Sequence, residues 1–255
     1  GFDVSAAGNQ LSLLTSGSIT DSGAQLITAD SLSITTGGDI GSAADAIDIS
    51  SSDVTLNITV PGNMDLQNTG DITLSNIDTT DGYIAINSSG QLNAIDVQSG
   101  NNNNINLTAN AIAVDFINAG SGNVLLNSAT GITQSNVVSS VEIVAAQLTA
   151  DSTSGFELDT QITFANISDS ATGSIILNND TVDLTLVNID TVDGSISVTN
   201  SGQLNVTDAQ TGNGNALNLS GTGLLAGSIN TAAGILTLDA NNGLLLDGTT
   251  ASIAG

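Results

Sequence analysis

The chain lacks every basic side chain. Its 255 residues include no lysine, arginine or histidine, whereas 25 aspartate and glutamate residues give it a formal charge of −25. Protein surfaces bind nucleic-acid phosphates and anionic lipids mainly through basic side chains. The sequence therefore predicts no nucleic-acid partner and no direct membrane insertion of this segment.

Cysteine is also absent, and aromatic residues make up only 2% of the chain. Without cysteine there is no disulfide framework and no thiolate metal site. Without His, Cys, Lys and Arg there can be no Ser-His-Asp triad and no Schiff base. The groups left for chemistry are carboxylates, hydroxyls and a single tyrosine, Tyr83. We therefore expect that the protein is not an enzyme.

Hydrophobic residues make up 40% of the chain, which is too many for an acidic disordered tail. Because aromatics are scarce, the predicted core consists of Leu, Ile, Val and Ala. Only two of the 25 acids are glutamates, Glu142 and Glu157, and the rest are aspartates, which favour turns. The composition indicates a folded body with a narrow aliphatic interior and acidic turns.

Short runs in which apolar and other residues alternate recur throughout the chain. Such runs, closed by Gly, Asn, Asp or Ser, predict strands with one buried face. The runs begin at Leu11, Leu32, Ile47, Met64, Ile84, Ile105, Val124, Val141, Phe156, Ile175, Ile196, Leu217 and Leu236. Subtracting each start number from the next gives steps of 21, 15, 17, 20, 21 and 19 in the first half, and of 17, 15, 19, 21, 21 and 19 in the second.

A longer repeat underlies these runs. Residues 76–100, NIDTTDGYIAINSSGQLNAIDVQSG, return at 188–212 as NIDTVDGSISVTNSGQLNVTDAQTG, with 15 of 25 residues identical and an offset of 188 − 76 = 112. The pattern of steps also repeats. We expect two copies, at about 11–123 and 124–235, and the start of a third at 236–255.

Sub-units of this length, without helical periodicity, predict the coils of a β-solenoid. The regular leucine-rich-repeat frame and the Gly-Asp nonapeptide that binds calcium are both missing. We predict an all-β fold, a right-handed parallel β-helix of about 12 coils in two tandem units of six. Residues 1–255 would form a single rod-like domain.

The aspartates of the NID-T-x-D-G motif are the candidate functional residues. Asp78 and Asp81, with their repeats Asp190 and Asp193, occupy the same place in each copy. A structural corner would be duplicated in this way, whereas a catalytic carboxylate pair would occur once. We therefore predict corners and no catalytic residue, and keep these four as weak candidates for binding Ca²⁺ or another cation. The run Asn101–Asn104 is predicted to be a solvated loop between coils.

Two stretches resemble a known family. They are GSITDSGAQLITADSLSITTGGDIGSAADAIDIS, residues 17–50, and GNMDLQNTGDITLSNID, residues 62–78. Their style resembles the repeat region of bacterial filamentous haemagglutinin-like exoproteins and large adhesins. The resemblance covers nearly all of the chain, but the complete loss of Lys and Arg departs from it. It implies a secreted right-handed β-helix that projects from a Gram-negative cell as a stalk or fibre.

Two functions follow as expectations. The first is a structural repeat segment of a secreted surface fibre, with further copies of the repeat or end-to-end self-association as its partners. The second is an adhesin that binds cell surfaces or glycans, with divalent-cation bridges compensating for its negative charge. In both cases the expected location is the cell surface or the extracellular matrix.

Overall fold

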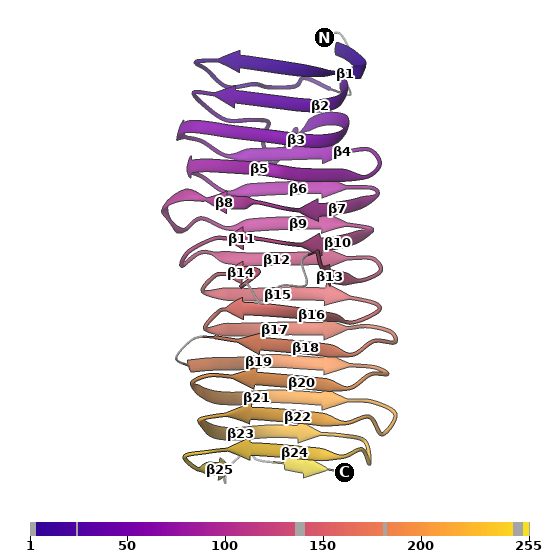
Figure 1. The fold of residues 1–255 in the computed structure, drawn as a ribbon, viewed down its shortest axis with the longest axis vertical. Coiled ribbons are helices and arrows are strands. Elements are labelled where there is room, and N and C mark those ends of the chain that lie inside the picture. The colour runs from indigo at the N-terminus through magenta and orange to yellow at the C-terminus, as the bar shows by residue number, and fades with distance from the viewer. Residues whose placement is uncertain (1–3, 24, 136–140, 181–182, 247–251, 255) are drawn as a thin grey trace. The chain divides into compact units, whose positions relative to one another are not determined.

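The chain forms an all-β parallel solenoid of about 12 turns, which confirms the predicted fold class (Figure 1). The computed structural model describes residues 4–23, 25–135, 141–180, 183–246 and 252–254. It divides into two compact units, Gly1–Asn127 and Ser128–Gly255. Within the described residues the only helical segment is a 3-10 turn, η1, at Gly100–Asn102.

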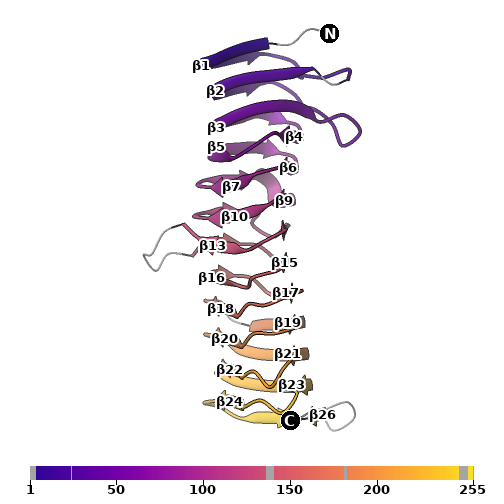
Figure 2. The same cartoon turned by 90° about the vertical axis from the view of Figure 1, so that its right-hand side faces the viewer.

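The strands of the first unit run in parallel layers. They are β1 (Val4–Thr15), β2 (Leu26–Thr36), β3 (Ile47–Pro61), β4 (Met64–Asn68), β5 (Ile72–Asp81), β6 (Ile84–Ser88), β7 (Gln91–Ala94), β8 (Val97–Ser99), β9 (Ile105–Ala109), β10 (Ala111–Val114), β11 (Ile117–Asn118) and β12 (Asn123–Ser128), whose last residue already belongs to the second unit. Figure 2 shows how successive strands of this unit lie one above another.

The strands of the second unit are built in the same way. They are β13 (Ile132–Gln134), β14 (Ile143–Val144), β15 (Gln147–Ser152), β16 (Phe156–Gln161), β17 (Phe164–Asp169), β18 (Ile175–Asn179), β19 (Asp183–Thr191), β20 (Ile196–Asn200), β21 (Gln203–Thr211), β22 (Leu217–Gly221), β23 (Gly223–Asn230), β24 (Leu236–Ala240), β25 (Leu244–Leu246) and β26 (Ser252–Ala254).

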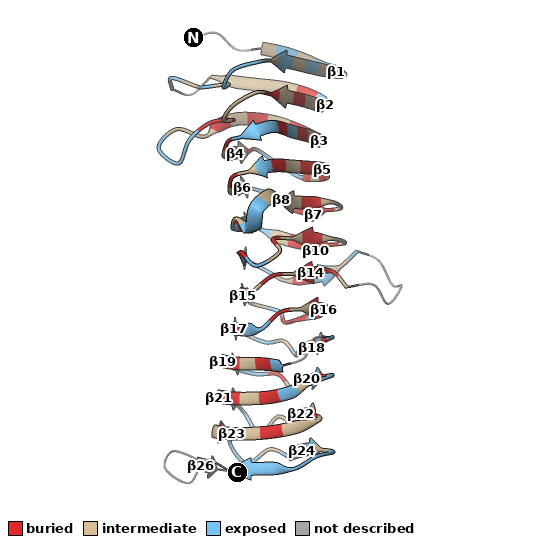
Figure 3. Cartoon of the chain, turned by 90° about the vertical axis from the view of Figure 1, so that its left-hand side faces the viewer, coloured by how far each residue is buried: buried red, intermediate tan, exposed pale blue. Residues whose placement is uncertain are grey.

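Stacked aliphatic side chains form the core of each unit. In the first unit Leu32 is in register with Val54, and Val54 with Leu74, and all three side chains are fully buried. Along strands such as β19 and β21 buried residues alternate with more exposed ones, as Figure 3 shows in red, tan and blue. Each buried side chain contributes roughly 25 cal/mol per Å² of apolar surface removed from water.

The coil period is visible in the register of the ladders. In the second unit five inward residues follow one another in a single column: Phe156, Ile175, Ile196, Leu217 and Leu236. These are the starts of five predicted runs, so the steps between them in the sequence are true coil advances.

The shorter steps in the first unit have a different origin. Leu32 is paired with Val54, a step of 54 − 32 = 22, whereas Ile47 belongs to another column and is paired with Leu66. The short step from Leu32 to Ile47 therefore crosses from one face of a coil to another. The sequence pattern does not reveal this, because both faces carry the same alternation.

Glycine and asparagine shape the corners, as expected. A Cβ at Gly82 or Gly194 would overlap the carbonyl oxygen of the preceding coil, at Gly62 and Gly173 respectively. Asn101 and its counterpart in the second copy, Asn213, both have positive φ, of 50° and 54°. Asparagine tolerates this left-handed conformation better than most residues do.

Stacked asparagine side chains lie inside the second unit. Asn179 and Asn200 are each only 4% exposed and are in register on β18 and β20. Asn179 Nδ2 donates to Asn200 Oδ1 over 2.8 Å, and Asn200 Nδ2 donates to the carbonyl of Gln203, also over 2.8 Å. Both bonds satisfy buried amides, and the first links successive coils.

Candidate functional site

Asp78 and Asp190 occupy matching positions on β5 and β19. Asn76 Nδ2 donates to Asp78 Oδ2 over 3.0 Å, and Asn188 Nδ2 donates to Asp190 Oδ1 over 2.9 Å. Residues two apart on a strand share a face, so each asparagine lies beside its aspartate. The motif thus builds the same amide-carboxylate pair in both copies of the repeat.

Asp81 and Asp193 are held from the following coil. Asn103 Nδ2 donates to Asp81 Oδ1 over 2.8 Å, and Asn215 Nδ2 donates to Asp193 Oδ1 over 2.9 Å. Each of these two amides also donates, over 2.9 Å, to the backbone carbonyl three residues earlier, that of Gly100 or Gly212. Asn103, the third asparagine of the Asn101–Asn104 run, therefore links its own corner to the corner of the preceding coil by a hydrogen bond.

These four aspartates do not form a metal centre with one another. Across the ranges that the structure describes, no group of three or more His, Cys, Asp or Glu side chains could hold a metal ion. Each of the four carboxylates instead accepts a hydrogen bond from a neighbouring amide. Asp81, the last residue of β5, and Asp193, between β19 and β20, lie at corners as predicted. Asp78 and Asp190 lie within strands, so the corner interpretation is wrong for these two. Cation binding at the four residues stays a prediction.

Other carboxylates also bridge coils, by accepting hydrogen bonds from the backbone about one coil further along. Asp71 Oδ1 accepts the N–H of Gln91 over 2.8 Å, and its repeat Asp183 accepts that of Gln203 over 3.1 Å. Asp39 Oδ1 accepts the N–H of Asn63 over 2.7 Å. Bonds of this kind help the fold to tolerate a surface of a single charge sign, because each carboxylate gains a donor.

One polar cluster is not repeated. The Tyr83 hydroxyl donates to Asp65 Oδ2 over 2.7 Å, and Asp65 is only 5% exposed. Burial, followed by the effect of Asp65, raises the pKa of Tyr83 to about 12, and burial also raises the pKa of Asp65. The counterpart of Tyr83 in the second copy is Ser195, so that copy cannot form this pair. Composition singled out Tyr83 but gave no sign of its partner.

The side chain of a buried glutamate in the second unit takes the place of a backbone acceptor beside β16. Glu142 is 1% exposed, and its Oε2 accepts the N–H of Asp159 over 2.6 Å and Nε2 of Gln134 over 3.1 Å. Its Oε1 has no hydrogen-bond partner. Burial raises the pKa of this carboxyl group. This role could not be predicted from the sequence, because glutamate is rarely buried.

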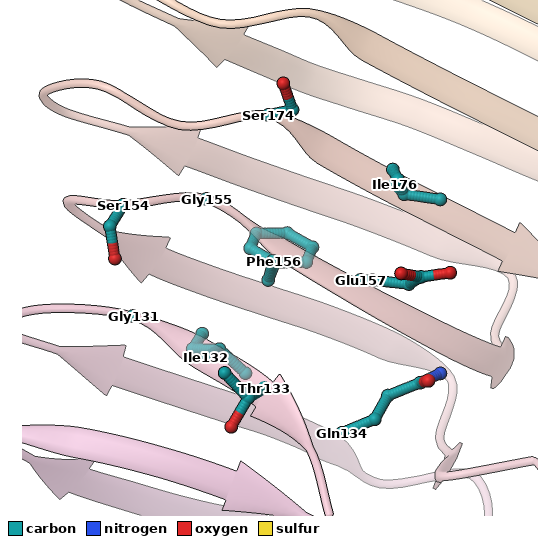
Figure 4. A pocket seen from close by; sticks show the side chains of 10 residues that line it. All are labelled: Gly131, Ile132, Thr133, Gln134, Ser154, Gly155, Phe156, Glu157, Ser174 and Ile176. Carbon is teal, nitrogen blue, oxygen red and sulfur yellow. The ribbon is translucent and has the colours of Figure 1, made fainter. Parts of the chain in front are cut away.

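A groove of about 430 Å³ lies between coils of the second unit (Figure 4). Three stretches of chain line it: the start of β13, the turn leading into β16, and the start of β18. Its lining residues are Gly131, Ile132, Thr133, Gln134, Ser154, Gly155, Phe156, Glu157, Ser174 and Ile176. None of these residues was predicted as a site, because they come from separate coils and match no motif.

Comparisons with known proteins give no relative to which the chain could be assigned. No family model matches the sequence, no curated protein matches it, and no solved structure matches the fold. In the described part of the chain no helix has the length and apolar character needed to cross a membrane.

Proposed function

We propose that the chain is a structural repeat segment of a secreted bacterial surface fibre or stalk. The observation that carries this proposal is the duplication of contacts between the two copies. Amide-carboxylate pairs, inter-coil bonds and left-handed asparagines recur at the same offset between the copies, with nearly the same distances. Duplicated geometry of this kind suits a scaffold whose length grows by copying.

The parallel ladders explain how such a scaffold could extend. Successive coils present backbone donors and acceptors in register with one another, as between β20 and β22. A further copy of the repeat, or a second molecule stacked end to end, would meet the same template. We propose these as the partners of the segment.

A secreted, non-catalytic role in a Gram-negative bacterium completes the proposal. It is supported by the resemblance of residues 17–50 to haemagglutinin-like exoproteins and by the absence of His, Cys, Lys and Arg. The strong negative charge would keep neighbouring fibres apart in solution.

Electron microscopy of the native assembly tests the fibre function. A thread of uniform width, labelled along its length by an antibody against this segment, is the expected result. Separate short particles, or label confined to one end of a larger structure, would contradict a repeat segment.

The second candidate function is an adhesin that binds cell surfaces or glycans, with divalent cations as bridges. The groove of the second unit favours it, since exposed hydroxyls and a carboxylate line it beside apolar side chains. Response to chelators separates the two candidates. Bundling that calcium promotes and EDTA reverses indicates a bridging fibre, whereas selective binding to one glycan indicates an adhesin.

A further inference from the structure

The groove of the second unit lies where the backbone ladder is interrupted. Strand β16 pairs with β14 and with β18, but the described residues show no pairing between β16 and β13. The two segments are nevertheless close, since a Cβ at Gly131 would lie 2.5 Å from Ser154 Oγ. Elsewhere in this unit adjacent strands close such a gap with backbone hydrogen bonds, as β18 and β20 do.

At the interruption, one residue of β16 directs its backbone N–H and C=O groups toward β13 without a pairing strand in the described residues. The N–H of Phe156 donates to the carbonyl of Ser174 over 2.9 Å, so this residue faces β18. Successive residues of a parallel strand direct their N–H and C=O groups to opposite sides. Glu157 therefore directs its backbone donor and acceptor to the side on which β13 lies. One donor and one acceptor are too few to hold an added peptide strand.

Glu142 supports the far end of the same edge. Because its Oε2 accepts the N–H of Asp159, the carboxylate satisfies a backbone group that a neighbouring strand would otherwise satisfy. Gln134 donates its Nε2 to that same oxygen, which fixes the amide and leaves its carbonyl oxygen as an acceptor in the groove lining. Hydrogen bonds of Glu142 to both sides of the groove thus hold it in place.

The lining combines polar groups with an apolar floor. Three exposed hydroxyl side chains, Thr133, Ser154 and Ser174, and the exposed carboxylate of Glu157 surround the partly exposed Ile176. A volume of about 430 Å³ falls within the range of roughly 300–1,000 Å³ that is usual for small-molecule sites. Hydroxyls, an amide and a carboxylate over apolar carbon can both donate to and accept from a polyhydroxylated ligand.

Electrostatics narrow the class of ligand. The chain contains no Lys, Arg or His and carries a formal charge of −25, so it offers no counter-charge to an acidic ligand. A single exposed carboxylate among hydroxyls and an amide fits a neutral partner better than a polycation, which would call for several carboxylates. The neutral ligands that match this set of donors and acceptors are saccharides.

We propose that the groove between β13 and β16 binds a neutral oligosaccharide, with Thr133 and Glu157 contacting its hydroxyl groups. The proposal does not depend on the fibre function, since a fibre with no ligand or a monomeric binder could each carry the groove. In the first unit Ile19 and Thr20 correspond to Ile132 and Thr133, and they line a hollow of about 250 Å³. Four apolar and four polar side chains line that hollow. Its volume lies below the range that is usual for small-molecule sites, and we assign it no ligand.

The test uses the full 255-residue chain and saturation-transfer difference NMR. The probes are cellohexaose, maltohexaose and laminarihexaose, with hexagalacturonate as an anionic probe and spermidine as a cationic one. The groove variant carries Thr133→Val and Glu157→Gln, and the matched control carries Thr237→Val and Asp239→Asn on exposed positions of β24. Circular dichroism and thermal unfolding establish that both variants fold.

We expect at least one neutral hexasaccharide to bind saturably, with affinity reduced tenfold or more in the groove variant and unchanged in the control. We expect hexagalacturonate not to bind. The proposal is overturned if no neutral probe binds, if only spermidine binds, or if the groove variant and the control lose affinity equally.

Discussion

The two copies of the repeat share a β-bulge, but the outward side chains around it differ. In the first copy Ser75 is the extra residue between β3 and β5, and in the second copy Val187 is the extra residue between β17 and β19. At the first bulge Asp53 accepts hydrogen bonds from both Ser31 and Ser75. At the second, Phe164 replaces the aspartate and is 46% exposed, beside Val187 at 44%.

The comparison teaches that inward residues fix the backbone while outward residues vary freely. Leu74 and Leu186 immediately precede the extra residue in the two copies, and both side chains are fully buried. The bulge forms both with the polar clamp of Ser31, Asp53 and Ser75 and with the apolar pair of Phe164 and Val187. Neither group of outward side chains is therefore needed to form it. Surface chemistry can therefore diverge between copies without a change of fold.

The largest effect should come from the inward leucines. Leu74→Ala and Leu186→Ala should each lower the free energy of unfolding by about 2–5 kcal/mol, because each removes a buried side chain and leaves a cavity. Urea unfolding followed by circular dichroism measures both. A loss at one leucine several times larger than at the other would show that the two bulges do not depend on equivalent packing. Val187→Ala is the exposed control.

The clamp of the first copy should contribute less. Asp53→Ala removes the acceptor shared by Ser31 and Ser75, and since the site is only half-buried we expect a loss of about 1 kcal/mol. The same urea titration detects it. If Asp53→Ala matched the wild type within error, these hydrogen bonds would add nothing to the stability of the first bulge.

Rebuilding the clamp in the second copy should have a smaller effect still. Phe164→Asp together with Val187→Ser places a carboxylate and a hydroxyl at positions equivalent to Asp53 and Ser75. We expect a favourable coupling energy of about 0.5 kcal/mol in a double-mutant cycle. A coupling of zero or of opposite sign would mean that the two bulges differ in backbone geometry as well as in side chains.

The smallest effect concerns Asp190. Burial, and then the Asp208 carboxylate, raise the pKa of Asp190. The folded chain therefore holds this proton more tightly than the unfolded chain does. Stability should rise as the pH falls through the raised pKa, with the gain complete below the ordinary value of 3.8.

At neutral pH Asp190→Asn should consequently stabilise the chain by a few tenths of a kcal/mol, since solvent still screens the charge of this half-buried group. Carbon-detected NMR titration of the Asp190 carboxyl reads the pKa directly. In the Asp208→Asn variant that pKa should move down, and an unchanged value would exclude Asp208 as a cause.

The coil architecture could be predicted because it depends on a local, repeated signal. Alternating aliphatic residues define the buried face, and the step from Phe156 to Ile175 is the true coil advance. The assignment of runs to faces could not be predicted, as the step from Leu32 to Ile47 shows. Both faces of a coil obey the same alternation, and only the three-dimensional register distinguishes them.

The candidate aspartates illustrate the same limit. Duplication of Asp78 at Asp190 predicted a structural corner, but both residues lie within strands and pair with an asparagine on the same face. Such a pair on a strand is duplicated as readily as a corner, so duplication alone could not distinguish the two. The groove and the buried Glu142 could not be predicted, because both arise where one ladder is interrupted. Nothing in the residues near Thr133 indicates that β13 and β16 will fail to pair.

That interruption also has a mechanical consequence. In a stacked parallel sheet, a pull on the chain peels one layer at a time, and the resistance of each layer depends on the hydrogen bonds that join it to the next. In the residues that the structure describes, β13 and β16 show no backbone pairing, and we expect part of the load to fall on the Glu142 carboxylate. Under tension, we expect the second unit to yield first at this layer.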